Sequence, residues 1–126
     1  MISLSLPAPP SLNSSYANLP GRGRIASRAL KSWKKEAGLR ILLQKPGKIV
    51  GWFQFEATIQ RMPRQKCADI DNRIKHLVDI CVAHGVVDDD KLMVSVKGTW
   101  VSPGAGDACR VTISPASNGT DTGDHP

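Results

Sequence analysis

The sequence predicts one small α+β domain with a mixed, mainly antiparallel sheet of about four strands and two helices. Three observations lead to this class. Several segments alternate between apolar and polar residues, two segments repeat apolar residues at helical spacing, and turn-forming residues separate them. A chain of 126 residues has the length of a single domain. We expect the domain to span residues 1–114, with residues 115–126 forming a disordered tail.

The N-terminal half is predicted to contain a strand, a loop, a helix and a second strand. Residues 1–6 alternate as a strand does, whereas residues 7–24 are rich in Pro, Ser, Asn and Gly and predict a loop. Ser27 can cap a helix that begins near Arg28. The predicted apolar side of this helix consists of Ala29, Leu30, Trp33, Ala37 and Ile41. Residues 48–60 alternate again and predict a long strand.

The C-terminal half is predicted to contain a helix followed by two strands. Residues 72–84 give the clearest helical pattern in the chain, and Gly85 is suited to end that helix. The apolar stripe of the helix consists of Ile74, Leu77, Val78, Cys81 and Val82. Residues 92–100 and 109–114 predict strands. One face of the first of these strands is expected to hold Leu92, Val94, Val96 and Trp100.

Composition argues against several classes of protein. No apolar run reaches the roughly 18 residues of a membrane helix, and the N-terminus lacks the charged region of a signal peptide. The three cysteines are odd in number and form no Cys-x-x-Cys pair, which disfavours a disulfide framework or a zinc site. We therefore expect a cytoplasmic protein with reduced cysteines and no membrane partner.

The charge is unevenly distributed along the chain, although the net charge is +6. Residues 1–66 contain twelve Lys or Arg and two Glu, for a net charge of +10, whereas residues 67–126 contain five Lys or Arg and nine Asp, for −4. This asymmetry favours a half that binds a polyanion such as nucleic acid, joined to an acidic site. The alternative is an ordinary solvated basic surface. Candidate phosphate contacts are Arg22, Arg24, Arg28, Lys31, Lys34, Lys35, Arg61, Arg64 and Lys66.

Two aspartates precede the second helix. Asp69 and Asp71 are one residue apart, so in an extended segment both carboxylates would point to the same side. A divalent cation between them would remove their repulsion, and oxygen ligands favour Mg²⁺ or Mn²⁺. The alternative is structural, with Asp71 as the N-cap of the helix and Asp69 as a loop carboxylate.

Further charged residues extend this pattern. Lys75 and Asp79 follow Asp71 at intervals of four, which places all three on one helix face, either as an ion-pair ladder or as a cation beside a metal site. Three adjacent aspartates, residues 88–90, follow the helix and form either an exposed turn or the rest of that site. The chain can barely return from the helix end to its start. Either a strand beginning at Asp90 runs straight back along the helix, or a partner subunit supplies part of the site.

The stretch "DIDNRIKHLVDICVAHGVVDDDKLM" resembles the core motif of the RusA family of Holliday-junction resolvases, small endonucleases common in phages and prophages. The family pattern maps onto Asp69, Asp71, Asn72, Lys75, Asp79, Gly85, Asp89 and Asp90. The opening "SLSLPAPPSLNSSY" is also similar to the first strand, proline segment and tyrosine of the family. The resemblance covers residues 1 to about 114.

The resemblance implies a homodimer that binds a four-way DNA junction and makes two symmetric nicks, with Mg²⁺ or Mn²⁺ as cofactor and no small-molecule substrate. It places the metal aspartates at Asp69, Asp71 and Asp90 and the essential lysine at Lys75. It also implies a place beside DNA in the cytoplasm of a bacterial host. Tyr16 could stack on an unpaired base at the junction or pack as an ordinary aromatic. The alternatives are a DNA-binding protein without catalysis and a nuclease acting on other branched DNA.

Overall fold

The structure, a computed structural model, describes residues 1–11, 16–19, 23–61, 69–104 and 106–117. Its main sheet has four strands in the spatial order β1-β6-β4-β5. Their bounds are Ile2–Leu6 for β1, Phe53–Gln60 for β4, Met93–Val101 for β5 and Cys109–Pro115 for β6. The β1–β6 and β6–β4 pairs are antiparallel, whereas β4 and β5 are parallel. The predicted α+β class, with a four-stranded mixed sheet and two helices, is confirmed.

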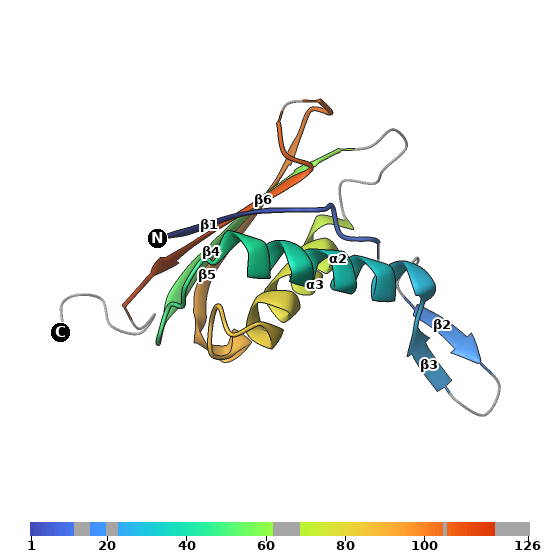
Figure 1. The fold of residues 1–126 in the computed structure, drawn as a ribbon, viewed down its shortest axis with the longest axis horizontal. Coiled ribbons are helices and arrows are strands. Elements are labelled where there is room, and N and C mark those ends of the chain that lie inside the picture. The colour runs from blue at the N-terminus through green and yellow to red at the C-terminus, as the bar shows by residue number, and fades with distance from the viewer. Residues whose placement is uncertain (12–15, 20–22, 62–68, 105, 118–126) are drawn as a thin grey trace.

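Both helices pack against one face of this sheet (Figure 1). They are α2 (Arg28–Gln44) and α3 (Ile70–Ala83). Alternate residues of β4, from Phe53 to Ile59, are buried beneath the helices, while the intervening polar residues face outward. The buried apolar residues of both helices and of one sheet face therefore form a single core. In the part of the chain that the structure describes, neither helix is long and apolar enough to cross a membrane.

Helix α2 begins and packs much as its sequence predicts. The Ser27 hydroxyl accepts a hydrogen bond from the Leu30 amide at 3.2 Å, which caps the helix. The predicted apolar side is buried except for Ala29, which is exposed. Gly38 is buried as well, and a side chain there would meet the imidazole of His84, which follows α3. The two helices thus approach closely at a residue without a side chain.

Side chains from α2 secure the N-terminal strand and the loop after it. The Gln44 amide pairs with the backbone of β1, accepting from Ser5 N and donating to Ser5 O, each at 2.8 Å. The Trp33 indole donates to the Pro7 carbonyl at 2.9 Å. The Trp33 side chain therefore satisfies a loop carbonyl that has no partner within the sheet.

Several predicted boundaries differ from the observed ones. Residues 7–24 were expected to form a loop, but β2 (Tyr16–Leu19) pairs with β3 (Gly23–Ala26) in a separate antiparallel hairpin. Turn-forming residues dominate the composition there, so the two strands of four residues each give no clear signal in the sequence. The strand expected over residues 48–60 begins at Phe53, because Gly51 adopts a φ of 83° that interrupts the extended backbone. Helix α3 begins two residues earlier than predicted, at Ile70.

Strand β5 runs back along α3. Val96 and Trp100 lie beside Phe55 and Ile59 of β4, on the predicted face, but the register shifts near Met93, so Val94 has no partner in the ladder. Leu92 belongs to a short 3₁₀ turn before β5 rather than to the strand.

At the other end of the chain, the Ala116 amide donates a hydrogen bond to the Trp52 carbonyl at 2.9 Å, so order extends beyond residue 114. Residues 118–126 of the predicted tail lie outside the described residues.

Candidate functional site

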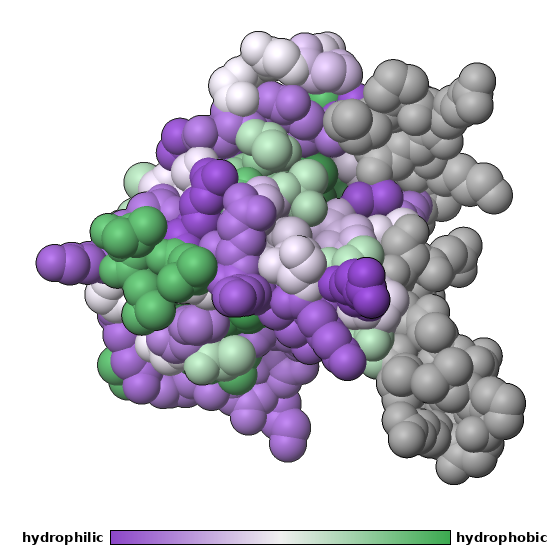
Figure 2. All heavy atoms as spheres, turned by 45° about the vertical axis from the view of Figure 1, so that its right-hand side comes forward, coloured by the Kyte–Doolittle hydropathy of each residue, from purple (hydrophilic) through white to green (hydrophobic). Residues whose placement is uncertain are grey.

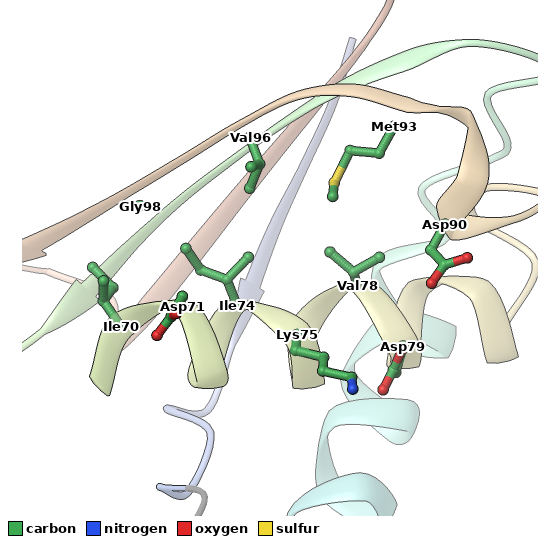
Figure 3. A pocket seen from close by; sticks show the side chains of 10 residues that line it. All are labelled: Ile70, Asp71, Ile74, Lys75, Val78, Asp79, Asp90, Met93, Val96 and Gly98. Carbon is green, nitrogen blue, oxygen red and sulfur yellow. The ribbon is translucent and has the colours of Figure 1, made fainter. Parts of the chain in front are cut away.

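A groove of about 480 Å³ lies between α3 and β5 (Figure 3). Its apolar walls come from α3 on one side and from β5 on the other. They consist of Ile70, Ile74, Val78, Met93, Val96 and Gly98. Its polar residues are Asp71, Lys75, Asp79 and Asp90. Four of the residues singled out from the sequence therefore line one groove, which we call the α3–β5 groove.

Helix α3 positions three of these polar residues. Asp71, Lys75 and Asp79 recur at intervals of four, so they share one exposed face, while Leu77 and Cys81 face the core. In Figure 3, Asp71 lies at one end of the groove, and Asp79 and Asp90 lie near each other at the opposite end. Lys75 lies between the two ends. The groove thus carries one carboxylate at one end, two carboxylates at the other end, and the Lys75 ammonium group between them.

The three consecutive aspartates after α3 have different roles. Asp88 forms an ion pair with Lys48, with 2.6 Å between Oδ1 and Nζ, and this bond lowers the pKa of Asp88. Asp89 caps the 3₁₀ turn Asp90–Leu92 by accepting from the Lys91 amide at 3.0 Å, which lowers the pKa of Asp89. Of the three, Asp90 lines the groove. The structure therefore separates Asp88, which lies outside the family pattern, from the groove.

The pKa of Asp90 is raised. The largest cause is its hydrogen bond with the Asp89 side chain, followed by loss of hydration and by the negative charges of Asp89 and Asp79. Carboxylates crowded in this way hold their negative charges at a cost, which a bound cation would remove. The end of the groove near Asp79 and Asp90 is therefore suited to a cation.

Asp69 does not line the groove. It is the residue before α3, and its Oδ2 accepts from the Nε of Arg73 at 2.9 Å, while its Oδ1 accepts from the Asn72 amide group at 3.4 Å. The expectation that Asp69 and Asp71 point to the same side of an extended segment is wrong. Because Asp71 lies in the first turn of the helix, it is rotated by about 200° from Asp69. Asp71 is likewise not the N-cap, and its Oδ1 accepts from the Asn72 backbone amide at 2.9 Å.

The two acidic ends of the groove are well separated. Asp71 and Asp79 are eight residues apart, a rise of about 12 Å along α3. Strand β5 does run back along the helix, but Asp90 precedes it and stays at the far end from Asp71. Among the residues that the structure describes, no three His, Cys, Asp or Glu side chains gather closely enough to hold a metal ion. The structure thus brings Asp90 near Asp79 but not near Asp69 or Asp71.

The predicted DNA contacts are only partly within the described residues. Arg28, Lys31, Lys34 and Lys35 on α2 and Arg61 after β4 are exposed. Arg24 and Tyr16 belong to the β2–β3 hairpin, of which the structure describes the backbone alone, and Arg22, Arg64 and Lys66 lie outside the described residues. Hydrophilic residues cover most of the coloured surface in Figure 2. An exposed basic face on α2 is therefore compatible with phosphate contacts.

Sequence reasoning missed Arg73, which is buried at the start of α3. Its spacing of four from Asp69 was visible in the sequence, but its other contacts come from distant segments.

Comparison of the chain with protein-family models gives no match, and no curated protein matches it. The resemblance to the RusA family stays a prediction from the residue pattern.

Proposed function

We propose that this protein is a Mg²⁺-dependent, structure-specific endodeoxyribonuclease that resolves four-way DNA junctions by paired symmetric nicks as a homodimer. The observation that carries the proposal is the α3–β5 groove, whose otherwise apolar surface is lined by Asp71, Lys75, Asp79 and Asp90. Carboxylates with a nearby lysine are the residue types that metal-assisted phosphodiester hydrolysis uses.

The groove fits a hard divalent cation by its donor chemistry. Its potential ligands are carboxylate oxygens, which suit Mg²⁺ and Mn²⁺ better than softer metals. Asp71 and Asp90 would hold the ion, with Asp79 and Asp89 in support. When bound, the ion would stabilise the charge that develops on the phosphate and the leaving oxygen. Lys75 would contribute a second positive charge within reach of the same phosphate.

A second copy of the chain would complete the site. Strand β1 forms one edge of the sheet and is covered at Ser5 by the Gln44 amide, whereas β5 forms the other edge, beside the groove. There Val96 is 50% exposed. If two copies of β5 pair antiparallel across a two-fold axis, their grooves run in opposite directions. Asp71 of one protomer would then approach Asp90 of its partner, which the separation within one chain prevents.

The basic surface supports the choice of DNA as substrate. Arg28, Lys31, Lys34 and Lys35 lie exposed on α2, and the groove carries the carboxylates on a different helix. Contacts with phosphates release counterions, so junction binding should weaken steeply as the salt concentration rises. A DNA-binding protein without catalysis would show this salt dependence too, so binding alone does not test the proposal.

A nicking assay on a synthetic four-way junction tests the activity. Wild-type protein should nick the junction with Mg²⁺ and not with EDTA, at positions symmetric about the branch point. Asp71→Asn should abolish nicking and leave junction binding within about twofold, because it removes a cation ligand and no phosphate contact. Asp88→Asn is the matched control, since Asp88 pairs with Lys48 away from the groove. Absence of nicking by the wild type would favour the non-catalytic alternative, and nicking of flaps alone would favour other branched DNA.

Mixed dimers test whether the site is shared. We expect a dimer of one Asp71→Asn chain and one Asp90→Asn chain to nick one strand, because one of its two sites retains both aspartates. If each site were built from a single chain, both sites would lack a ligand and the mixed dimer would be inactive.

A further inference from the structure

Arg73 is the most enclosed charged side chain near the groove, with 9% of its surface exposed. Its guanidinium contacts three segments of the chain. Nε donates to Asp69 at 2.9 Å, and Nη1 donates to the Pro9 carbonyl at 2.5 Å. Its Cζ lies 5.7 Å from the centre of the Trp100 ring, at the end of β5. One side chain thus joins the start of α3, the loop after β1 and the strand that forms the other wall of the groove.

These contacts use two donors and one face of the guanidinium. Arginine offers several donors in a rigid plane, and the same plane can stack on an aromatic ring. A lysine at this position could neutralise Asp69 or reach Pro9, but one ammonium cannot reproduce both bonds and the stacking. The arrangement therefore depends on arginine and not on positive charge alone.

Arg73 also fixes the orientation of the Asp69 carboxylate, which lies next to the groove. Both oxygens of Asp69 are engaged, one by Arg73 and the other by Asn72. Asp69 immediately precedes the turn of α3 from which Asp71 projects into the groove. A change in the Arg73–Asp69 pair would therefore shift the first turn of α3 relative to β5, and with it the position of Asp71.

We propose that Arg73 is a positioning residue of the α3–β5 groove, acting through Asp69 on the first turn of α3. This inference rests on the proposed function. Residues that hydrogen-bond directly to metal ligands typically change metal affinity or activity by about 10- to 100-fold when they are replaced. Because Arg73 acts on Asp71 only through Asp69, we expect an effect at the lower end of this range. The same guanidinium donates to the Pro9 carbonyl, so it also connects the loop after β1 to the Asp71 end of the groove.

The test measures cation affinity in Arg73→Lys, by Mn²⁺ titration and by the Mg²⁺ concentration that half-saturates nicking. We expect both values to rise about 10-fold. Arg40→Lys is the matched control, because Arg40 forms an i,i+4 pair with Glu36 at 3.1 Å on the exposed side of α2, and it should change neither value. A purely structural role for Arg73 would lower the melting temperature and the yield of active protein without changing either cation concentration.

Asn72→Ala provides a second test of the same inference if Arg73→Lys fails to fold. It removes the other contact to Asp69 and should weaken Mn²⁺ binding in the same direction, by a smaller factor. Unchanged or tighter Mn²⁺ binding in the variants would overturn the role of Arg73 while leaving the nuclease proposal intact. Wild-type protein that binds no Mn²⁺ would overturn the proposed function, and the role of Arg73 with it.

Discussion

Gly98 allows α3 to approach β5 at the floor of the groove, and its replacement gives a quantitative test of the packing. A Cβ atom at Gly98 would lie 2.2 Å from Cδ1 of Ile74 and 3.2 Å from Cδ1 of Ile70. Carbon atoms in contact are normally about 3.5–4.0 Å apart. Gly98→Ala must therefore displace the end of the Ile74 side chain by more than an ångström or lift α3 from the strand.

The expected cost of Gly98→Ala follows from two opposing effects. Overpacking costs about 1–3 kcal/mol, and the cost should be in the lower half of this range because Cδ1 is the end of a flexible side chain. Alanine in a strand is favoured over glycine by about 0.5–1 kcal/mol, which offsets part of the cost. We expect the free energy of unfolding, measured by urea denaturation, to fall by about 1 kcal/mol.

Ile74→Val tests whether this particular contact is the cause, because it removes Cδ1, the atom that the new methyl group would meet. Alone, it should cost about 0.5–1.5 kcal/mol. Combined with Gly98→Ala, it should cost less than the sum, with a coupling of about 1 kcal/mol. Ile41→Val, on the buried side of α2, is the control and should be additive with Gly98→Ala. Additivity of Gly98→Ala and Ile74→Val within about 0.5 kcal/mol would refute the reasoning.

Two further predictions follow from buried titratable groups. Burial lowers the pKa of His76 below its ordinary value of 6.5. Below pH 6.5 the imidazole is therefore protonated more readily in the unfolded chain than in the folded chain, which favours unfolding. The stability of the wild type should decline as the pH falls from 6.5 toward 5, and His76→Leu should flatten that decline in urea unfolding curves. Burial raises the pKa of the Cys81 and Cys109 thiols to about 12, so both stay protonated at pH 8. In a Cys67→Ser background, a thiol reagent should therefore label the native protein only as fast as it unfolds.

Local periodicity was sufficient to predict both helices and most of their buried residues. Ile74, Leu77 and Cys81 face the core as their spacing indicated, because an amphipathic helix buries its apolar stripe in any fold that covers it. Ser27 also acts as the predicted cap, because its bond to Leu30 is local. Features that depend on the spacing of residues within one element, such as the buried face of a helix and its cap, were thus predictable from the sequence.

The start of α3 could not be predicted in the same way. Asp71 has the residue type of an N-cap, but the helix begins before it, and the side chain of Asp69 bonds to Arg73 rather than to a backbone amide. Arg73 is in turn held by Pro9 and Trp100, which lie 64 and 27 residues away along the chain. Contacts over such separations leave no local pattern, so the orientation of the two aspartates depends on the folded chain.

The separation of the acidic ends limits how the proposed nuclease could bind its cation. An ion such as Mg²⁺ sits about 2.1 Å from each oxygen ligand, so two carboxylates that share one ion have oxygens within about 4 Å of each other. Asp71 and Asp79 are about three times that distance apart along α3, and Asp90 lies at the Asp79 end. A monomer with this groove could hold a cation at either end but could not use all of its carboxylates on one ion. If the nicking assay succeeds, activity should therefore depend on protein concentration through dimer formation, and a stable monomer that nicks junctions at the wild-type rate would contradict the shared site.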